Sequence, residues 1–240
     1  MVRLLIVDDE AETAAHVEAD LLSLDSGYRI TRVESCGAAL QIQENSFDII
    51  LLDIILPDAK GIDLCPLLRA RHRCPILFIS CLDDSDSIVQ AFDQGGDDYV
   101  CKPFDSKVLH ARIQANLRRV NAAREQPQPQ AAGDYVLDGR NYTVLLHGEQ
   151  IQLLPIEFHI LAFLLGHPGQ YFKSKELYQI IWGADSFGDT RTVHVHIHNL
   201  RRKLHDDMDN PRIIRNERGR GYTMSSSSSG SVTMNSAPSP

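Results

Sequence analysis

Five polar residues stand where strand-like apolar runs of the sequence end, and their types suit one kind of chemistry. They are Asp8, Asp9, Asp53, Ser80 and Lys102. Three carboxylates brought together repel one another unless a hard cation lies between them, and Mg²⁺ suits a setting rich in oxygen ligands. The cation and the Lys102 ammonium would also offset the negative charge on a phosphoryl group during in-line transfer. These residues predict a Mg²⁺-dependent phosphoryl-transfer site, provided that the fold brings them together.

The elements that must position these side chains alternate along the first half of the chain. Strands are predicted at 3–8, 29–33, 48–53, 75–80 and 99–101, and helices at 10–24, 37–45, 61–69, 85–94 and 106–124. The runs 49–52 and 76–79 are apolar throughout, as strands covered on both faces must be. This alternation predicts an α/β fold with a doubly wound, five-stranded parallel sheet, in which the carboxyl ends of the strands gather ligand chemistry at one edge.

Length and composition favour two globular domains. The 240 residues are 43% hydrophobic and 23% charged, which is typical of a chain long enough for two cores. No apolar run reaches the roughly 20 residues that span a bilayer, and the N-terminus lacks the apolar stretch of a signal peptide. The five cysteines lack metal-type spacing. We therefore expect buried, reduced thiols in a cytoplasmic protein without membrane contact.

The second half has a different organisation. Residues 122–133 contain two prolines and no apolar periodicity, so they are expected to form a linker. Strand-like runs at 135–137, 142–146 and 150–153 precede helical patterns at 155–165, 173–182 and 190–204 and a basic hairpin at 212–224. This order predicts a separate α+β domain over 134–224. The Ser-rich tail 225–240 cannot bury a core and is predicted to be disordered.

The helix expected at 190–204 has the composition of a DNA-reading helix. Its apolar stripe consists of Val193, Ile197, Leu200 and Leu204, and the other faces carry Arg191, His194, His198, Asn199, Arg201, Arg202 and Lys203. Such polar groups can contact phosphates or base edges in a major groove. The hairpin that follows has glycines at its turn and arginines suited to a minor groove. A solvated surface helix, or a metal site on His194 and His198, is the alternative, although no third ligand stands nearby.

The first 121 residues resemble the receiver domain of two-component response regulators, a flavodoxin-like fold. The matching residues are Asp8-Asp9, Asp53 with Leu56-Pro57 and Gly61, Ser80, and Asp97-Asp98-Tyr99 before Lys102-Pro103-Phe104. The resemblance implies that Asp53 accepts a phosphoryl group from a phosphohistidine of a sensor histidine kinase and that the chain has no other enzymatic activity. Mg²⁺ (or Mn²⁺) would be held by Asp8, Asp9, Asp53 and the Ile55 carbonyl. Lys102 would pair with the phosphoryl group, and Ser80 and Tyr99 would act as switch residues.

Residues 134–224 resemble the winged helix-turn-helix effector domain of the OmpR/PhoB class. The matching residues are Glu157-Phe158, Leu161, Leu164-Leu165, His167-Pro168-Gly169, 177–182, Arg191-Thr192-Val193 to Leu204, and Arg218-Gly219-Arg220-Gly221-Tyr222. The predicted DNA contacts are Arg191, Thr192, His194, His198, Asn199, Arg201, Arg202, Arg218 and Arg220. The whole chain is therefore expected to be a bacterial transcriptional regulator controlled by phosphorylation.

Some positions depart from the family pattern. Cys81 stands where a smaller residue is usual, Leu82 where a basic residue is usual, and Lys60 where an acidic residue is common. Because Ile55 and Leu82 are apolar and near the expected path of attacking water, we expect slow loss of the phosphoryl group. Leu154 replaces the Thr that usually caps the helix beginning at Pro155, at an expected cost of about 1 kcal/mol.

The resemblance also implies a mode of assembly. Phosphorylation would promote a homodimer through the fourth helix, fifth strand and fifth helix of the receiver. Asp97 and Asp98 are expected to face Arg112, Arg118 and Arg119 across that surface. Two DNA-binding domains would then occupy tandem half-sites about one helical turn apart, with RNA polymerase as a further candidate partner. The alternatives are a regulator that works without phosphorylation and a Mg²⁺-dependent hydrolase with Asp53 as nucleophile.

Overall fold

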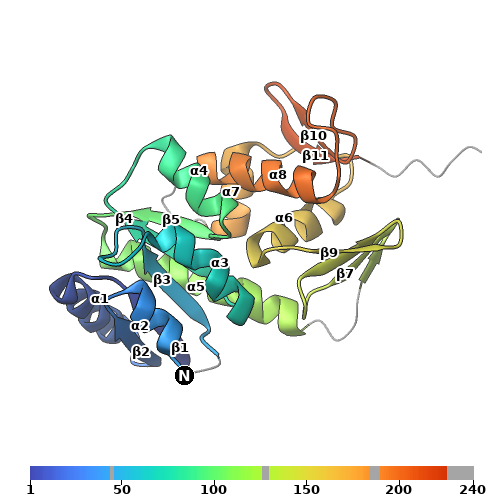
Figure 1. Cartoon of the computed structure of the whole chain (residues 1–240). Helices are drawn as coiled ribbons and strands as arrows, with labels where there is room; N and C mark the ends of the chain where they lie inside the picture. The colour runs from blue at the N-terminus through green and yellow to red at the C-terminus, as the bar shows by residue number, and fades with distance from the viewer. Residues whose placement is uncertain (44–45, 126–129, 184–189, 226–240) are drawn as a thin grey trace, which may run out of the picture.

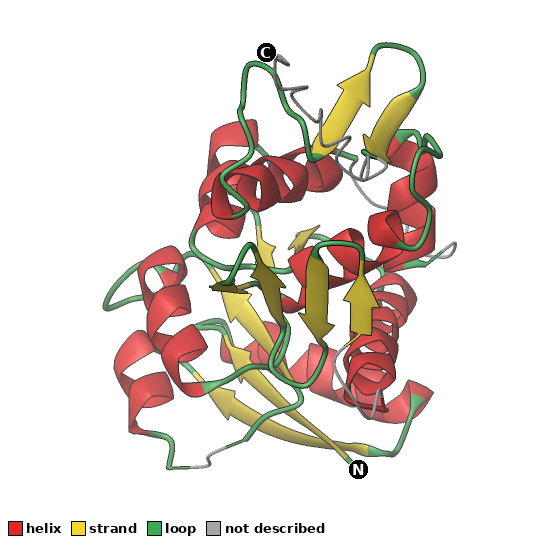
Figure 2. Cartoon of the chain, turned by 90° about the vertical axis from the view of Figure 1, so that its right-hand side faces the viewer, coloured by secondary structure: helices red, strands yellow, loops and turns green. Residues whose placement is uncertain are grey.

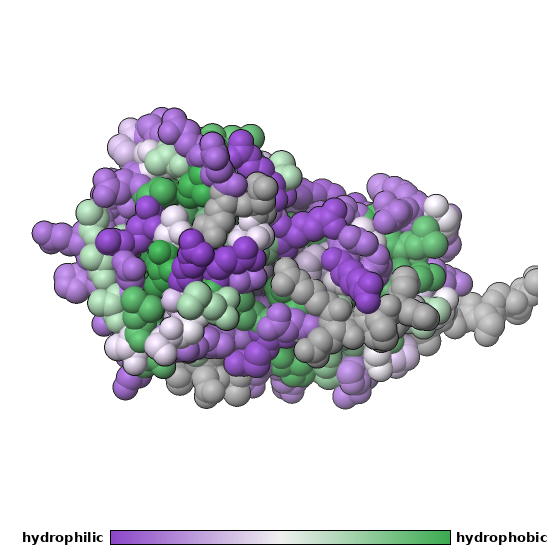
Figure 3. Space-filling model, turned by 90° about the horizontal axis from the view of Figure 1, so that it is seen from below, coloured by the Kyte–Doolittle hydropathy of each residue, from purple (hydrophilic) through white to green (hydrophobic). Residues whose placement is uncertain are grey.

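A computed structural model of the chain describes residues 1–43, 46–125, 130–183 and 190–225. They form two adjoining domains, each with its own buried apolar core (Figure 1). No helix among these residues is both long enough and apolar enough to cross a membrane. Seen from below, the surface carries small, separate apolar patches between hydrophilic residues (Figure 3).

The first domain has the five-stranded parallel sheet that the sequence predicts. Its strands lie in the order β2-β1-β3-β4-β5. They are β1 (Val2–Val7), β2 (Tyr28–Val33), β3 (Ile49–Asp53), β4 (Ile76–Ser80) and β5 (Asp98–Cys101). The helices are α1 (Ala11–Leu24), α2 (Cys36–Gln41), α3 (Gly61–Arg71), α4 (Ser85–Asp93) and α5 (Ser106–Glu125). From β1 the chain adds β2 on one side and β3, β4 and β5 on the other. In sheets of this kind, ligands bind at the carboxyl ends of the two strands where the order reverses, here β1 and β3.

Both faces of this sheet are covered, which explains the continuous apolar runs. One core contains Leu4, Ile49 and Leu77 from the sheet, together with side chains of α1 and α5. The other contains Ile50 and Phe78 with side chains of α2, α3 and α4. Every residue of β3 and β4 is buried. The helix predicted at 37–45 ends earlier than expected, at Gln41.

The second domain consists of a small sheet, three helices and a hairpin (Figure 2). Four antiparallel strands come first: β6 (Gln130–Ala132), β7 (Tyr135–Asp138), β8 (Thr143–Leu146) and β9 (Glu149–Gln152). The helices α6 (Pro155–Leu165), α7 (Ser174–Trp182) and α8 (Arg191–Lys203) follow, and β10 (Ile214–Glu217) pairs with β11 (Gly221–Met224). This is the expected winged helix-turn-helix arrangement.

A glycine is required where the hairpin meets the rest of this domain. Gly221 has φ +104°, and a Cβ there would lie 2.1 Å from the carbonyl oxygen of Phe172. The backbone of Phe172 exchanges hydrogen bonds of 2.9 and 2.8 Å with Tyr222. A side chain at residue 221 would therefore push the hairpin away from this anchor.

The expected domain boundaries fall within continuous structure. The predicted receiver limit at 121 lies inside α5, and Ala123 of α5 is buried in the core of the second domain. Part of the predicted linker 122–133 is occupied by α5 and β6, while residues 126–129 lie outside the described part of the chain. The predicted disordered tail also lies outside it from residue 226 onwards. The boundaries 1–121 and 134–224 therefore stay predictions.

Candidate phosphoacceptor site and nucleic-acid interface

Three carboxylates meet at the carboxyl ends of β1 and β3, as their positions in the sequence predict. One ligand atom of each of Asp8, Asp9 and Asp53 lies within 4.8 Å of the other two. Asp8 and Asp53 are 1% and 5% exposed, whereas Asp9 is exposed. Carboxylate oxygens at this separation suit a hard divalent cation that keeps some of its water ligands.

Lys102 joins two of these carboxylates. Its Nζ lies 2.8 Å from Asp8 Oδ2 and 2.6 Å from Asp53 Oδ2. Burial opposes the charge on Lys102, but the hydrogen bonds to Asp53 and Asp8 raise the pKa of the amine above its ordinary value. Burial also raises the pKa of Asp8, against the lowering effect of Lys102. Counted formally, three aspartates and one lysine carry a charge of −2, which a divalent cation balances.

The β3–α3 loop holds Asp53 in place. The Ile55 N–H donates to Asp53 Oδ1 at 3.0 Å, and the Ile55 side chain is 54% exposed. Gly61 packs so closely that a Cβ there would lie 1.8 Å from the carbonyl oxygen of Asp53, so this position accepts only glycine. Lys60, the preceding residue, is exposed at the N-terminus of α3. The metal contact expected of the Ile55 carbonyl stays a prediction.

The two predicted switch residues meet at the β4–α4 loop. Ser80 is fully buried, and its Oγ accepts from the Leu82 N–H at 3.4 Å. The Tyr99 hydroxyl donates to the Leu82 carbonyl at 2.6 Å. Burial raises the pKa of Tyr99, so its phenol stays neutral. A displacement of Ser80 would therefore also displace Leu82, and with it the Tyr99 hydroxyl that donates to the Leu82 carbonyl.

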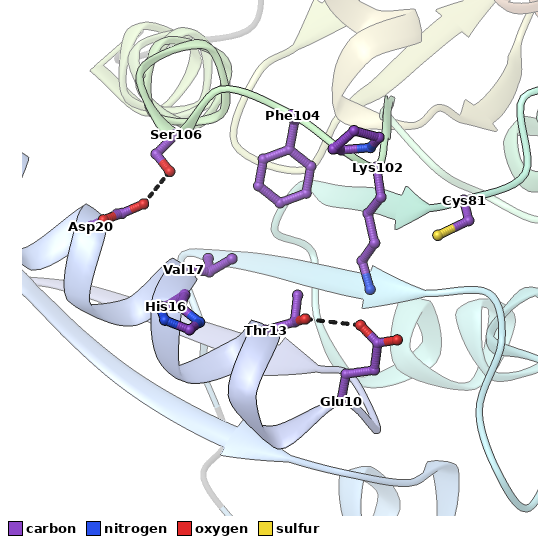
Figure 4. A pocket seen from close by; sticks show the side chains of 10 residues that line it. Glu10, Thr13, His16, Val17, Asp20, Cys81, Lys102, Phe104 and Ser106 are labelled. Atoms are coloured by element: carbon purple, nitrogen blue, oxygen red, sulfur yellow. Dashed lines mark hydrogen bonds between the residues drawn. The ribbon is translucent and has the colours of Figure 1, made fainter.

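A cavity of about 430 Å³ opens beside the acidic cluster. Its walls come from α1, from the end of β4 and from the segment between β5 and α5 (Figure 4). Lys102 and Cys81 lie at one end of it, and at the other end Ser106 of α5 donates to Asp20 of α1. Val17 and Phe104 provide apolar surface between these ends. The cavity therefore reaches Lys102 from the α1–α5 side.

The prediction that all five cysteines are buried is wrong for two of them. Burial raises the pKa of Cys36 to about 11 and those of Cys65 and Cys74 to about 12. Cys81 and Cys101, however, are exposed. Both follow or end strands at the carboxyl edge of the sheet, where neither helical layer covers them.

The predicted DNA-reading helix forms, but several of its polar residues are buried. The stripe of Val193, Ile197, Leu200 and Leu204 is at most 3% exposed. Arg191, His194, His198 and Arg202 are exposed, whereas Thr192 and Asn199 are 3% and 2% exposed. The Arg201 guanidinium donates to the Ile214 carbonyl at 2.9 and 2.7 Å. In this structure Arg201 therefore joins α8 to the hairpin.

One face of α8 lies against the receiver (Figure 1). Arg191 Nη1 donates to Ser85 Oγ of α4 at 2.6 Å, and Arg202 lies 3.8 Å from Asp93. Val195 packs against the receiver core. A DNA duplex cannot reach this face of α8 while α4 occupies it.

His196 lies at the centre of this domain interface. It is fully buried, with ring centroids 4.7 Å from Phe92 of the receiver and 5.9 Å from Trp182 of α7. Arg119 of α5 lies over the Trp182 ring at 5.6 Å and donates to the carbonyl of Ile181. No pattern in the sequence indicates these contacts, because an aromatic or a histidine on an amphipathic helix is ordinary core material.

The hairpin of β10 and β11, here called the wing, carries Arg218 and Arg220 at its turn. Arg218 is exposed, next to the turn at Gly219. The Arg220 guanidinium stacks over Tyr171 at 3.7 Å and pairs with Glu217 at 3.0 Å. Arg218 is therefore placed to reach a groove, while Arg220 supports the hairpin.

The histidine pair on α8 gains no third ligand from the described residues. His194 Nδ1 lies 2.5 Å from the Tyr222 hydroxyl, within the second domain. Within the described ranges, the group whose ligand atoms lie close enough together to share a metal ion is Asp8, Asp9 and Asp53. His194 is therefore held by Tyr222 within its own domain, and His198 is exposed.

The acidic residues expected at a dimer surface are used inside the chain. Asp97 and Asp98 are fully buried, which corrects the expectation that they lie on that surface. Asp98 pairs with Arg112 at 2.9 Å, and Asp97 pairs with Arg69. Arg118 is exposed, but Arg119 contacts α7. Asp98 is enclosed within the receiver beside α5, whereas Asp97, the residue before β5, is covered in part by Ile156 of α6.

The comparisons with known proteins agree with both domains. The model for the response regulator receiver domain matches residues 4–114, and that for the C-terminal domain of transcriptional regulatory proteins matches residues 148–224. The DNA-binding response regulator MtrA of Mycolicibacterium smegmatis is 37% identical over 92% of this chain and 95% of its own length. MtrA of Mycobacterium tuberculosis is 36% identical over the same shares.

Solved structures show the same two-domain architecture. A mutant of the protein RitR has a TM-score of 0.71 at 27% identity and covers 93% of this chain and 99% of its own. DrrB of Thermotoga maritima, described as an OmpR/PhoB homologue, has a TM-score of 0.50 at 29% identity and covers 94% and 100%. A receiver sheet joined to a winged-helix domain defines a response regulator that binds DNA. The chain belongs to the OmpR/PhoB family of two-component response regulators and is a transcriptional regulator.

Proposed function

We propose that Asp53 accepts a phosphoryl group from a phosphohistidine of a sensor histidine kinase. The observation that carries this proposal is the bridge from Lys102 to both Asp53 and Asp8 within a cluster of three carboxylates. An Asp53 oxygen would bond to phosphorus as the phosphorus–nitrogen bond of the donor breaks. Lys102 would then exchange part of its contact with Asp53 for the phosphoryl oxygens.

The residues at this edge fit a divalent cation. Asp8, Asp9 and Asp53 would hold Mg²⁺ or Mn²⁺, with the Ile55 carbonyl as a further ligand. When bound, the cation neutralises charge on the phosphoryl oxygens. The chain's own residues do the rest. Asp53 supplies the attacking oxygen, Lys102 neutralises the product, and the cavity beside Lys102 admits the donor. The chain then acts on no other substrate.

We infer that phosphorylation controls the exposure of α8. Ser80 and Tyr99 both contact Leu82 in the segment that leads into α4, and α4 lies against α8. A phosphoryl group adds nearly two negative charges beside Ser80, which favours a different position of this segment. Released from α4, Arg191 and Asn199 would become available to DNA.

The proposed assembly follows from the same face. Once α8 leaves α4, the receiver face formed by α4, β5 and the first part of α5 is free to form a homodimer. Two copies would occupy tandem half-sites, with the wing residue Arg218 at a minor groove. Contact with RNA polymerase, and a location in the bacterial cytoplasm where kinase and DNA meet, belong to the same proposal.

The test begins with the mass of the intact protein. Incubation with a small phosphodonor and Mg²⁺ should add one phosphoryl group to the wild-type chain and none to Asp53→Asn. Asp63→Asn, an exposed carboxylate of α3, is the matched control and should take up the group normally. No gain on the wild type, or an equal gain on Asp53→Asn, would reject the proposal. Continuous consumption of the donor would favour the hydrolase alternative.

A further inference from the structure

The first turn of α6 has no cap from its own N-terminal residue. Leu154 occupies the N-cap position and offers no hydrogen-bonding side chain, and Pro155, which follows it, has no N–H. The Glu157 side chain turns back and accepts from the Leu154 N–H at 2.8 Å. This contact serves only one backbone donor. The N–H of Ile156, in the position that an N-cap side chain usually serves, needs another acceptor.

The acceptor comes from the other domain. The Ile156 N–H donates to Asp97 Oδ1 at 3.2 Å, and both residues are at most 1% exposed. The second oxygen of Asp97 is held inside the receiver, where it accepts from the Ile76 N–H at 2.9 Å and from the Arg69 guanidinium. Asp97 therefore presents a fixed, buried carboxylate to the N-terminus of α6. A negative charge in this place also suits the helix dipole.

We propose that Asp97 of the receiver caps α6 of the DNA-binding domain. Because Leu154 cannot cap this helix itself, α6 is capped only in the closed arrangement, in which the two domains are in contact as in this structure. Asp97 acts on α6 only while the domains are in contact. When they separate, the Ile156 N–H faces water with no side chain at residue 154 to accept from it. The cap consequently stabilises the closed arrangement relative to the open one. A residue at position 154 that capped α6 by itself would remove this stabilisation.

The size of this advantage follows from the known effect of helix caps. Replacing a capping side chain by one that cannot accept a hydrogen bond changes an equilibrium by about fivefold. A hydroxyl at residue 154 would cap the separated domain and gain little in the closed one, because Asp97 already serves Ile156 there. We therefore expect such a substitution to raise the open-to-closed ratio about fivefold.

Thr and Val at residue 154 make a matched pair of variants. The two side chains have nearly the same shape, so both lose the same part of the apolar contact of Leu154 with the core of the second domain. Only Thr can cap α6. The comparison of Leu154→Thr with Leu154→Val therefore isolates the hydrogen bond from the packing.

The experiment measures the open-to-closed ratio of the unphosphorylated full chain. Single-molecule energy transfer between a dye on α1 and a dye on the wing reports separation of the domains without any DNA. We expect a ratio about fivefold higher for Leu154→Thr than for Leu154→Val. Equal ratios, or a lower ratio for Leu154→Thr, would overturn the proposal. If either variant unfolds, the pair Leu154→Ser and Leu154→Ala decides in the same way.

This inference rests on the proposed function only for its consequence at DNA. Apparent affinity for DNA should follow the open fraction, so unphosphorylated Leu154→Thr should bind about fivefold more tightly than Leu154→Val. A difference in energy transfer without a difference in DNA binding would reject control of DNA binding by closure and leave the cap intact. Equal energy transfer with normal phosphorylation of Asp53 would reject the cap alone.

Discussion

Lys102 sets the charge balance of the acidic cluster at the scale of single residues. Its ammonium contacts Asp8 and Asp53 at 2.8 and 2.6 Å, so it occupies part of the space between carboxylates that a cation also uses. Under the proposed function the same amine would also neutralise a phosphoryl group. Cation binding and phosphoryl transfer are therefore expected to respond to Lys102 in opposite directions.

The substitution Lys102→Met separates the two effects. Without the ammonium, the carboxylates repel one another more strongly, so Mg²⁺ should bind several-fold more tightly in a calorimetric titration. Phosphoryl uptake followed by intact mass should slow by at least about tenfold. Lys107→Met, on the exposed first turn of α5, should leave both unchanged. Weaker Mg²⁺ binding in Lys102→Met would contradict this view of the site.

Ile55 and Leu82 are expected to govern how long a phosphoryl group on Asp53 would survive. Ile55 is exposed, and Leu82 is half-buried beside Ser80. Neither side chain can orient an attacking water. We expect a phosphoryl half-life of minutes or longer for the wild-type chain and at least a few-fold shorter life in Ile55→Asn, measured by loss of the added mass. A wild-type half-life of seconds would show that these side chains do not protect the bond.

The contact between α4 and α8 belongs to the scale of elements. Its polar part is exposed, since the side chains of Arg202 and Asp93 are 57% and 36% accessible. Exposed ion pairs contribute little, so most of the stability of this contact comes from His196, Phe92 and Val195. Ion pairing on this surface therefore adjusts the domain equilibrium without setting it.

Reversal of one charge on α4 tests this ranking. Asp93→Arg places two cations side by side and should raise DNA binding by the unphosphorylated chain about twofold to threefold. The effect should shrink in high salt. Asp86→Arg, an equal change in charge at an exposed position of the same helix, should have no such salt-dependent effect. An increase of about a hundredfold in Asp93→Arg, far beyond the usual range for exposed pairs, would mean that the pair, and not the apolar contact, holds the helices together.

The sequence predicted the elements and the acidic site well, for local reasons. Apolar runs such as those of β3 and β4 reveal buried strands, and carboxylates at their ends reveal the cluster of Asp8 and Asp53. The positions of Asp97 and His196 could not be predicted. Their roles depend on which surfaces of two domains meet, and neither periodicity nor residue type records that choice. The one local sign was Leu154, an N-cap residue without a cap.

At the scale of the whole molecule, acidity should shift the balance between closed and open arrangements. Burial lowers the pKa of His196 to about 3, with Lys203, Arg119 and Arg69 acting in the same direction and a contact with the Asp97 backbone opposing them. An imidazole exposed by opening would return towards the ordinary value of about 6.5. The closed arrangement therefore has its full stability above about pH 6.5 and loses it as the pH falls towards about 3.

The domain separation of the full chain should consequently increase as the pH falls. Between about pH 7.5 and about pH 5.5 the open-to-closed ratio should rise about tenfold, as measured by energy transfer. His196→Phe keeps an aromatic ring between Phe92 and Trp182 but cannot be protonated, so it should lose this response. His198→Gln, on the exposed side of α8, should keep it. Equal responses in the wild type and His196→Phe would assign the effect to another group whose pKa burial lowers, such as His159, with a pKa of about 3.

The passage of α5 into both domains has a consequence for response thresholds. Ala123 of α5 lies in the core of the second domain, and Gly139 packs against its carbonyl, since a Cβ there would lie 2.7 Å away. The halves therefore stay joined at this end when α8 leaves α4. Reclosure is then intramolecular, at an effective concentration of about millimolar. DNA or a second copy of the chain must therefore compete with the tethered receiver for α8. The concentration of DNA or of chain at which the regulator responds consequently depends on how α5 joins the two domains.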